Sequence, residues 1–137
     1  MMQRKVKTED VRALVQKWVP RLGLQAWIID AQVGETSDDA FAQINLNSQS
    51  MRGRLTVSEK FYEPSPLGIG EPDLERSILH ELVHACSNLL FERAGDALIE
   101  WGGEGFAVRG QRNELHELNE RLADQLAISL LRWDRGE

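Results

Sequence analysis

The fold and the chemistry of this chain of 137 residues depend on one stretch, Ser77-Ile78-Leu79-His80-Glu81-Leu82-Val83-His84-Ala85-Cys86. It contains the pattern His-Glu-x-x-His. Residues four apart lie one turn above each other on the same face of an α-helix, so the two imidazoles can share one metal ion. Zinc binds neutral imidazole and, in a catalytic site, keeps one position open for water. The carboxylate of Glu81 can then reach that water and act as a general base.

The residues around the motif form a broad apolar face, which is typical of a largely buried helix. Its members are Ile78, Leu79, Leu82, Val83, Ala85, Cys86, Leu89 and Leu90. His80 and His84 fall about half a turn from Leu82, the centre of that face. Histidines on such a polar strip are poorly placed for the core and well placed for a cleft. We therefore expect a metal site here rather than a chance match.

The composition is that of an ordinary globular domain, and we expect one domain over residues 1–137. The net charge is -6 and no strong Lys/Arg cluster is present, so nucleic acid is not expected as a partner. The single cysteine, Cys86, is compatible with a reducing cytosol and is expected to be a small core residue. We see no signal peptide and no run of transmembrane length, so we expect a cytoplasmic protein without membrane contact.

Hydrophobic periodicity predicts helices at both ends of the chain. The first is expected to begin with Thr8 as N-cap and to end at Pro20. The motif helix should start at about Pro72 and run to about Arg93, with Gly95 as its stop. A long amphipathic helix is expected over residues 113–133. The four tryptophans are spread along the chain at Trp18, Trp27, Trp101 and Trp133. Most are expected in the core, but Trp101 can line a pocket.

Three short apolar or alternating segments, at residues 24–31, 40–47 and 54–57, predict strands. Residues 61–72 contain two glycines and three prolines and are expected to form a loop. The predicted fold is therefore α+β: an N-terminal helix, a small mixed or antiparallel sheet of about three strands, and two long C-terminal helices enclosing the zinc site.

Two histidines do not complete a tight zinc site, and a third protein ligand is expected. The stretch Trp101-Gly102-Gly103-Glu104-Gly105-Phe106-Ala107 resembles the region around the zinc-binding Glu of gluzincin metallopeptidases, which implies Glu104 as the ligand. The stretch Leu115-His116-Glu117-Leu118-Asn119-Glu120-Arg121-Leu122-Ala123 resembles the ligand helix of that clan. This second resemblance implies that His116 replaces the usual Glu and that Glu120 supports a zinc-bound histidine. Small metallopeptidases of phages and prophages show a similar layout.

His116 is favoured over Glu104 as the third ligand because it lies within a strongly predicted helix, whereas glycines weaken a helix around Glu104. Glu117 and Glu114 remain further alternatives. Besides Glu120, the acids Asp124 and Glu100 are candidates to hold a ligating imidazole by its other ring N–H.

The motif and the resemblance imply zinc-dependent hydrolysis of a peptide or protein substrate, with Glu81 as general base. Tyr62, the only tyrosine, is a candidate donor to the oxyanion. An extended substrate would add to an edge strand, either residues 54–57 or residues 40–46. The alternatives are a structural zinc site closed by four protein ligands, and a partner-binding phage-type protein in which the site is vestigial.

Overall fold

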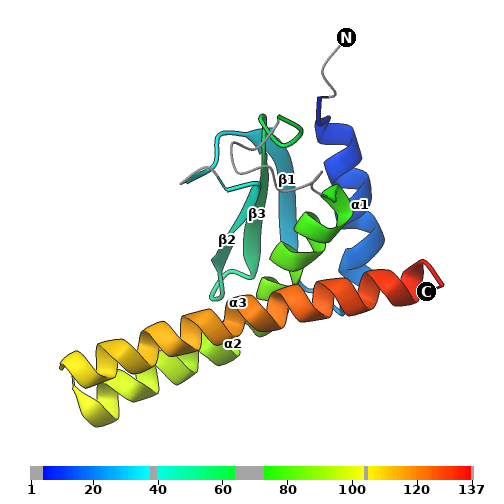
Figure 1. The fold of residues 1–137 in the computed structure, drawn as a ribbon. Helices are drawn as coiled ribbons and strands as arrows, with labels where there is room; N and C mark the ends of the chain where they lie inside the picture. The colour runs from blue at the N-terminus through cyan, green and yellow to red at the C-terminus, as the bar shows by residue number, and fades with distance from the viewer. Residues whose placement is uncertain (1–4, 38–39, 64–72, 104, 137) are drawn as a thin grey trace.

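The computed structural model describes residues 5–37, 40–63, 73–103 and 105–136. The elements follow in the order α1 (Thr8–Arg21), β1 (Ile28–Gly34), β2 (Ala42–Asn47), β3 (Arg52–Ser58), α2 (Leu74–Gly102) and α3 (Phe106–Asp134). Figure 1 shows a small sheet with α1 beside it, and α2 and α3 running side by side below it. The expected α+β class is confirmed, with its N-terminal helix, its three strands and its two long C-terminal helices.

The sheet is mixed and has the strand order β1-β3-β2. The central strand β3 pairs in parallel with β1 and antiparallel with β2. A tight turn joins β2 to β3. In it the side chain of Asn47 accepts hydrogen bonds from the backbone N–H groups of Gln49 and Ser50, both at 3.1 Å. Met51 completes the turn in the left-handed conformation with φ 54°. Because β3 is the central strand, β2 forms one edge of the sheet, and it lies beside α2.

Alternation along the strands gives the sheet one apolar face. The pairing places Ala31 and Ile44 on either side of Leu55. Gly53 belongs to this face because a Cβ there would meet the Leu46 side chain at 3.0 Å. α1 and the first turns of α2 pack on this face. The resulting core includes Val11, Val15, Trp18, Leu55, Val57, Phe61, Ile78, Leu79 and Leu82.

Charged side chains join α1 to the N-terminal end of α2 and the C-terminal end of α3. The Nζ atom of Lys17 lies 2.7 Å from Glu75 Oε2 and 2.8 Å from Asp134 Oδ2. The indole N–H of the buried Trp18 donates to the same Glu75 oxygen at 2.7 Å. One carboxylate thus neutralises a cation and satisfies the polar atom of the largest core side chain.

The start of α2 is fixed by Asp73, whose side chain accepts a hydrogen bond from the backbone N–H of Arg76 at 3.2 Å. This N-cap satisfies one of the free donors of the first helical turn. Arg135, just after α3, pairs with the same carboxylate at 3.0 Å. The N-terminal end of the motif helix is therefore held by the C-terminal end of the last helix.

α2 and α3 form an antiparallel hairpin whose far end extends beyond the sheet (Figure 1). The buried residues of α2 all lie between Ile78 and Ala85. Two contacts fix the register of the hairpin: Ser87 Oγ donates to Asn119 Oδ1 at 3.0 Å, and the Nε atom of Arg112 lies 4.0 Å from where a Cβ on Gly95 would stand. Residue 87 is therefore level with residue 119, and residue 95 with residue 112.

The expected helix ends are wrong in four places. Thr8 is the first residue of α1 and not its N-cap; Lys7 holds the cap position, without a side-chain hydrogen bond to the helix. Pro20 does not end α1, which continues to Arg21, and the backbone N–H of Leu22 still donates to the carbonyl oxygen of Trp18 at 2.9 Å. Gly95 does not stop α2, and the helix ends only at Gly102, followed by Gly103 with φ 74°. α3 begins at Phe106, not at residue 113. Mutual packing of the two helices outweighs the cost of about 1 kcal/mol for each internal glycine.

Cys86, which was expected in the core, lies at the surface, and so do two of the four tryptophans, most of which were expected in the core. Cys86 is exposed; the end of α1 partly covers its sulfur, which lies 3.7 Å from the carbonyl oxygen of Leu22, and this burial raises the pKa of the thiol. Trp101 is 89% exposed and Trp133 is 74% exposed. Apolar character at helical spacing did not reveal that α2 leaves the sheet after Ala85. No helix in the described ranges has an apolar stretch that could cross a membrane.

Candidate metal centre

The two motif histidines lie on the side of α2 that faces α3, while the opposite side of the same turns is buried against the sheet. Ile78, Leu79 and Leu82 are fully buried, whereas the side chains of His80 and His84 are 16% and 12% exposed. The polar strip predicted opposite Leu82 is therefore covered by α3 rather than by the core. A partly closed site between two helices results.

Three side chains converge in this site. The Nε2 atoms of His80 and His84 lie 3.2 Å apart. Glu120, on α3, approaches both with its carboxylate, Oε2 at 3.1 Å from His80 Nε2 and Oε1 at 3.1 Å from His84 Nε2. Within the described part of the chain, these are the three side chains whose ligand atoms lie within 4.8 Å of one another.

The spacing of these atoms fits a single zinc ion. Ligand atoms about 2.0–2.2 Å from a tetrahedral zinc ion lie roughly 3.3–3.5 Å from each other. The two imidazole nitrogens are 3.2 Å apart, and Glu120 contacts them with different oxygens, so one ligand atom from each residue lies within 4.8 Å of the others. The Glu120 side chain is 45% exposed, so the cluster is open to solvent on one side. Two imidazoles and one carboxylate are donors of the kind that zinc accepts.

Asp124 fixes the orientation of one ligand ring. Its Oδ1 atom accepts a hydrogen bond from His80 Nδ1 at 2.8 Å. Nε2 lies 3.1 Å from Glu120 Oε2, so both ring nitrogens have a carboxylate neighbour. In the tautomer that carries its proton on Nδ1, the lone pair of Nε2 is available to a metal ion. A carboxylate behind a histidine in this way is the common partner of a metal-binding imidazole.

His84 is held by α3 as well. The side chain of Asn119 hydrogen-bonds to His84, and Ser87 in turn donates to Asn119 at 3.0 Å. Burial lowers the pKa of His84, although the neighbouring carboxylate of Glu120 opposes this effect. The neutral imidazole is the form that binds a metal, so burial favours the ligand state.

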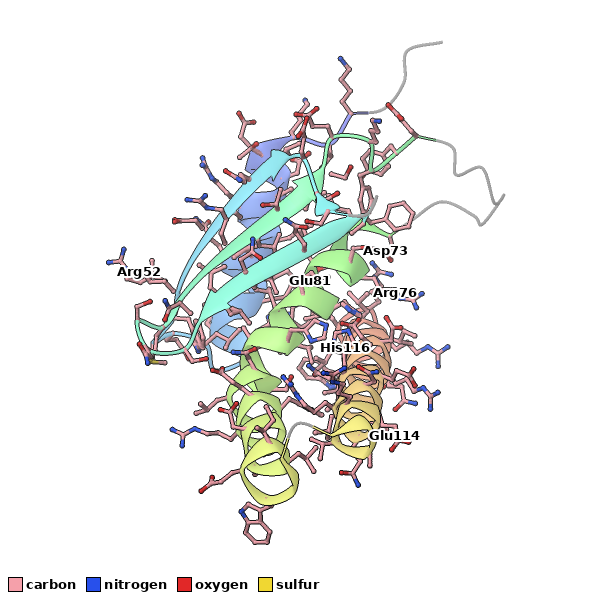
Figure 2. The ribbon with its side chains drawn as sticks, turned by 90° about the vertical axis from the view of Figure 1, so that its left-hand side faces the viewer. Arg52, Asp73, Arg76, Glu81, Glu114 and His116 are labelled. Carbon is pink, nitrogen blue, oxygen red and sulfur yellow. The ribbon has the colours of Figure 1, made fainter. Side chains whose placement is uncertain are left out.

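Glu81 lies between α2 and the edge strand β2 (Figure 2). Burial raises the pKa of its carboxyl to about 7; the charge of His80 lowers it and the charge of Glu120 raises it. The backbone N–H of Ile44, on β2, donates a hydrogen bond to this carboxyl group. A carboxyl group with a pKa near neutrality can both accept and release a proton, as an acid–base catalyst must.

The sequence predicted Glu120 as a support for a zinc-bound histidine and His116 as the third ligand. The contacts favour other roles for the residues of α3. Glu120 itself contacts both imidazoles, and the supporting acid behind His80 is Asp124. His116 is exposed and lies one turn before Glu120 on α3, near enough for its charge to lower the pKa of His84 (Figure 2). It is not a member of the converging group, and its ligand role stays a prediction.

The remaining candidates for ligands or supports are Glu104, Glu114, Glu117 and Glu100. Glu104 is outside the described residues. Glu114 and Glu117 are exposed on α3 and do not belong to the cluster of ligand atoms. Glu100 cannot support a ligand, since 16 residues of helix separate it from His84 and correspond to roughly 24 Å.

Tyr62 and the edge strand can now be located. The ring of Tyr62 packs edge-on against Phe61, with 5.0 Å between centroids, at the border of the core. Its role as an oxyanion donor stays a prediction. Of the two strands considered as the edge beside the cleft, residues 54–57 are excluded because β3 is the central strand. β2 is the edge strand next to Glu81.

The spacing of residues along α3 contained a sequence signal for the position of Glu120. Glu120 and Asp124 are one turn apart, and the small residues Ala123 and Ala127 beside them are fully buried. Small residues at this spacing let two helices approach closely, which brings the neighbouring acids to the facing helix. The resemblance of α3 to a ligand helix does not by itself identify which acid of α3 faces the histidines.

Comparisons with models of known protein families, with curated proteins and with solved structures found no match to this chain. The function is therefore inferred from the arrangement of His80, Glu81, His84, Glu120 and Asp124.

Proposed function

We propose that this protein is a zinc-dependent peptidase that acts on a peptide or protein. The single observation that carries the proposal is the convergence of Glu120 on His80 and His84, with 3.1 Å from each Nε2 atom to a carboxylate oxygen. His80, His84 and Glu120 would hold the metal. A bound zinc ion would supply Lewis acidity, which lowers the pKa of water and polarises a carbonyl group.

Glu81 acts as the general base of the proposed reaction. Its carboxylate takes a proton from the attacking water and passes it to the departing amine. The pKa of about 7 supports both steps, because the group exchanges its proton readily near neutral pH. A nearby dication would stabilise the carboxylate and so favour its basic form.

The substrate would bind in extended form along the outer edge of β2. An edge strand offers unpaired backbone groups to which a peptide can add as a further strand. β2 is such an edge, and the hydrogen bond between Ile44 and Glu81 brings it next to the general base. A peptide on this edge would thus have its backbone close to both Glu81 and the three proposed ligands. We also propose a cytoplasmic location, with the single thiol of Cys86 free.

The test combines metal content with cleavage by the full-length chain. Wild type should bind one zinc ion per chain and cleave an unfolded protein, with new termini identified by mass spectrometry. Glu81→Gln should keep the metal and lose activity by at least about 10²-fold, because it removes the base but no ligand. Glu117→Gln, an exposed acid on α3, is the matched control and should keep both properties.

Zinc binding without cleavage by the wild type, on a mixture of unfolded proteins, would refute the peptidase and leave a metal-binding protein. Equal activity in wild type and Glu81→Gln would refute the role of Glu81. A wild type that neither contains zinc after purification without chelators nor takes it up on addition would refute the metal site itself.

A further inference from the structure

The far end of the α2–α3 hairpin has an open apolar groove of about 550 Å³ between the two helices. We call it the hairpin groove. Its lining comes from one stripe on each helix: Ala94, Ala97, Leu98 and Trp101 on α2, and Gln111, Glu114, Leu115 and Leu118 on α3. Both stripes follow the spacing i, i+3, i+4 and i+7, which is how a helix presents a face to another helix.

Large apolar side chains are exposed at this groove. Trp101 is 89% exposed and Leu118 is 54% exposed. Leu90, one turn before Ala94, extends the α2 stripe and is 70% exposed. Covering an exposed tryptophan alone removes roughly 150–250 Å² from water. Exposed apolar patches of more than a few hundred Å² mark interaction surfaces in proteins.

The hairpin groove is separate from the candidate metal centre. On α3, Leu118 and Glu120 are two residues apart, so they point in directions that differ by about half a turn of helix. Glu120 faces His80 and His84, and Leu118 lines the groove. The groove therefore opens on another side of the hairpin and is not the cleft in which Glu81 lies.

Two opposite charges border the groove at the same level. Residue 95 is level with residue 112 and residue 87 with residue 119, so Arg93 on α2 is level with Glu114 on α3. Both are exposed. Within the described part of the chain, no ion pair involves either of them. A second hairpin, rotated by 180° about an axis along the groove, would place its Glu114 opposite Arg93 and its Arg93 opposite Glu114.

We propose that the hairpin groove is a dimer interface in which two copies of this chain face each other across a two-fold axis running along the groove. α2 of one copy then lies over α3 of the other, and the two hairpins form a four-helix bundle. Leu90 of each copy meets Leu118 of the other, and Arg93 meets Glu114. Each contact occurs twice because the interface is isologous.

The area agrees with a dimer of modest stability. The exposed parts of Leu90, Trp101 and Leu118 together amount to roughly 800–900 Å² for a pair of chains. The polar border, including Arg93 and Glu114, brings the total to about 1,200 Å², the lower end of specific interfaces. We therefore expect a concentration-dependent equilibrium between monomer and dimer.

The first test is sedimentation equilibrium of the full-length chain, with molar mass followed over a range of concentrations. Wild type should dimerise. Leu118→Glu should raise the dissociation constant of the dimer by at least about tenfold, since it puts two unpaired charges in the interface. Trp101→Ala should also weaken the dimer. Trp133→Ala is its matched control, because it removes another exposed tryptophan at the opposite end of α3. Far-UV circular dichroism checks that each variant is folded.

The second test exchanges the bordering charges. Arg93→Glu and Glu114→Arg should each weaken the dimer, and the double variant should restore it, because only a second copy returns the opposite charge to both positions. A wild type that stays monomeric at the highest concentration reached would overturn the proposal and leave the groove to a helix of another protein. A dimer unaffected by Leu118→Glu, or unrestored by the double exchange, would also overturn it.

Discussion

His80 and Asp124, 44 residues apart in the sequence, are joined by a hydrogen bond of 2.8 Å between Nδ1 and Oδ1. This bond links the motif helix to the last helix and turns the Nε2 atom of His80 toward Glu120, 3.1 Å away. The Asp124 carboxylate therefore orients the ring so that its second nitrogen, Nε2, points at both Glu120 and His84.

Removal of Asp124 should weaken metal binding without removing a ligand. We expect Asp124→Ala to lower zinc affinity by about 10–100-fold, the usual effect of losing the acceptor behind a ligating histidine. Asp124→Asn should lose less, because the amide oxygen still accepts the hydrogen bond. Competition with a chromogenic chelator measures the affinity, and Asp96→Asn, an exposed acid at the far end of α2, is the control. Unchanged affinity in Asp124→Ala would separate this residue from the metal site.

The identity of the third ligand gives a second prediction. Glu120→Gln should reduce the zinc content from about one per chain to a small fraction, because the neutral amide is a poor zinc ligand. His116→Ala should retain the metal, since His116 lies outside the converging group. Elemental analysis of both variants, purified without chelators, decides the point. The reverse result, with loss only in His116→Ala, would establish three histidines as the ligand set.

Local sequence patterns identified the helices and strands, because each of these elements depends on residues that are close in the sequence. The apolar positions on either side of His80 predicted a buried helix, and residues 42–47 and 52–58 form strands close to where alternation put them. The errors concern contacts between distant segments. Gly95 is a helix stop by local rules, yet α2 continues through it because α3 packs alongside, with Arg112 over the glycine.

In the candidate site, too, one part follows from local sequence and the other depends on contacts between distant segments. His80, Glu81 and His84 lie in one turn of helix, so their proximity follows from spacing alone. The choice among Glu104, His116 and Glu120 depends on the rotation of α3 about its axis, which the packing of Ala123 and Ala127 sets. The sequence placed Glu120 near a histidine but did not show which acid of α3 contacts both rings, because the interhelical register is a tertiary property.

The turns of α2 that carry the motif should depend strongly on core packing. Leu82 is fully buried beside the histidines. Leu82→Ala should lower the free energy of unfolding by about 2–5 kcal/mol, through lost apolar burial and the cavity left behind. Leu89→Ala, on the same helix but at a position 53% exposed, should change it by less than about 1 kcal/mol. Urea denaturation measures both, and similar losses in the two variants would contradict the burial of Leu82.

The charge network between the helices should make stability depend on acid pH. Although burial acts to raise it, hydrogen bonds from Lys17 and Trp18 hold the pKa of Glu75 below its usual value. Asp73 has a lowered pKa as well; burial opposes the shift, and the hydrogen bond from Arg135 drives it. A carboxyl group with a lowered folded-state pKa stabilises the protein above its unfolded pKa of about 4. That contribution is lost as the pH falls through the folded-state pKa.

Lys17→Met should therefore lower the melting temperature by a few degrees at pH 7, where Glu75 is ionised, and by much less at pH 2, where it is protonated. The pKa of Lys17 is raised by its hydrogen bonds to Asp134 and Glu75, so its own contribution is complete at pH 7 and is lost only in strong alkali. Lys60→Met, an exposed lysine outside the network, is the control and should leave the pH profile unchanged. Thermal melts from pH 2 to 8 make the comparison, and an equal loss at pH 2 and pH 7 would show that Lys17 stabilises by packing rather than by charge.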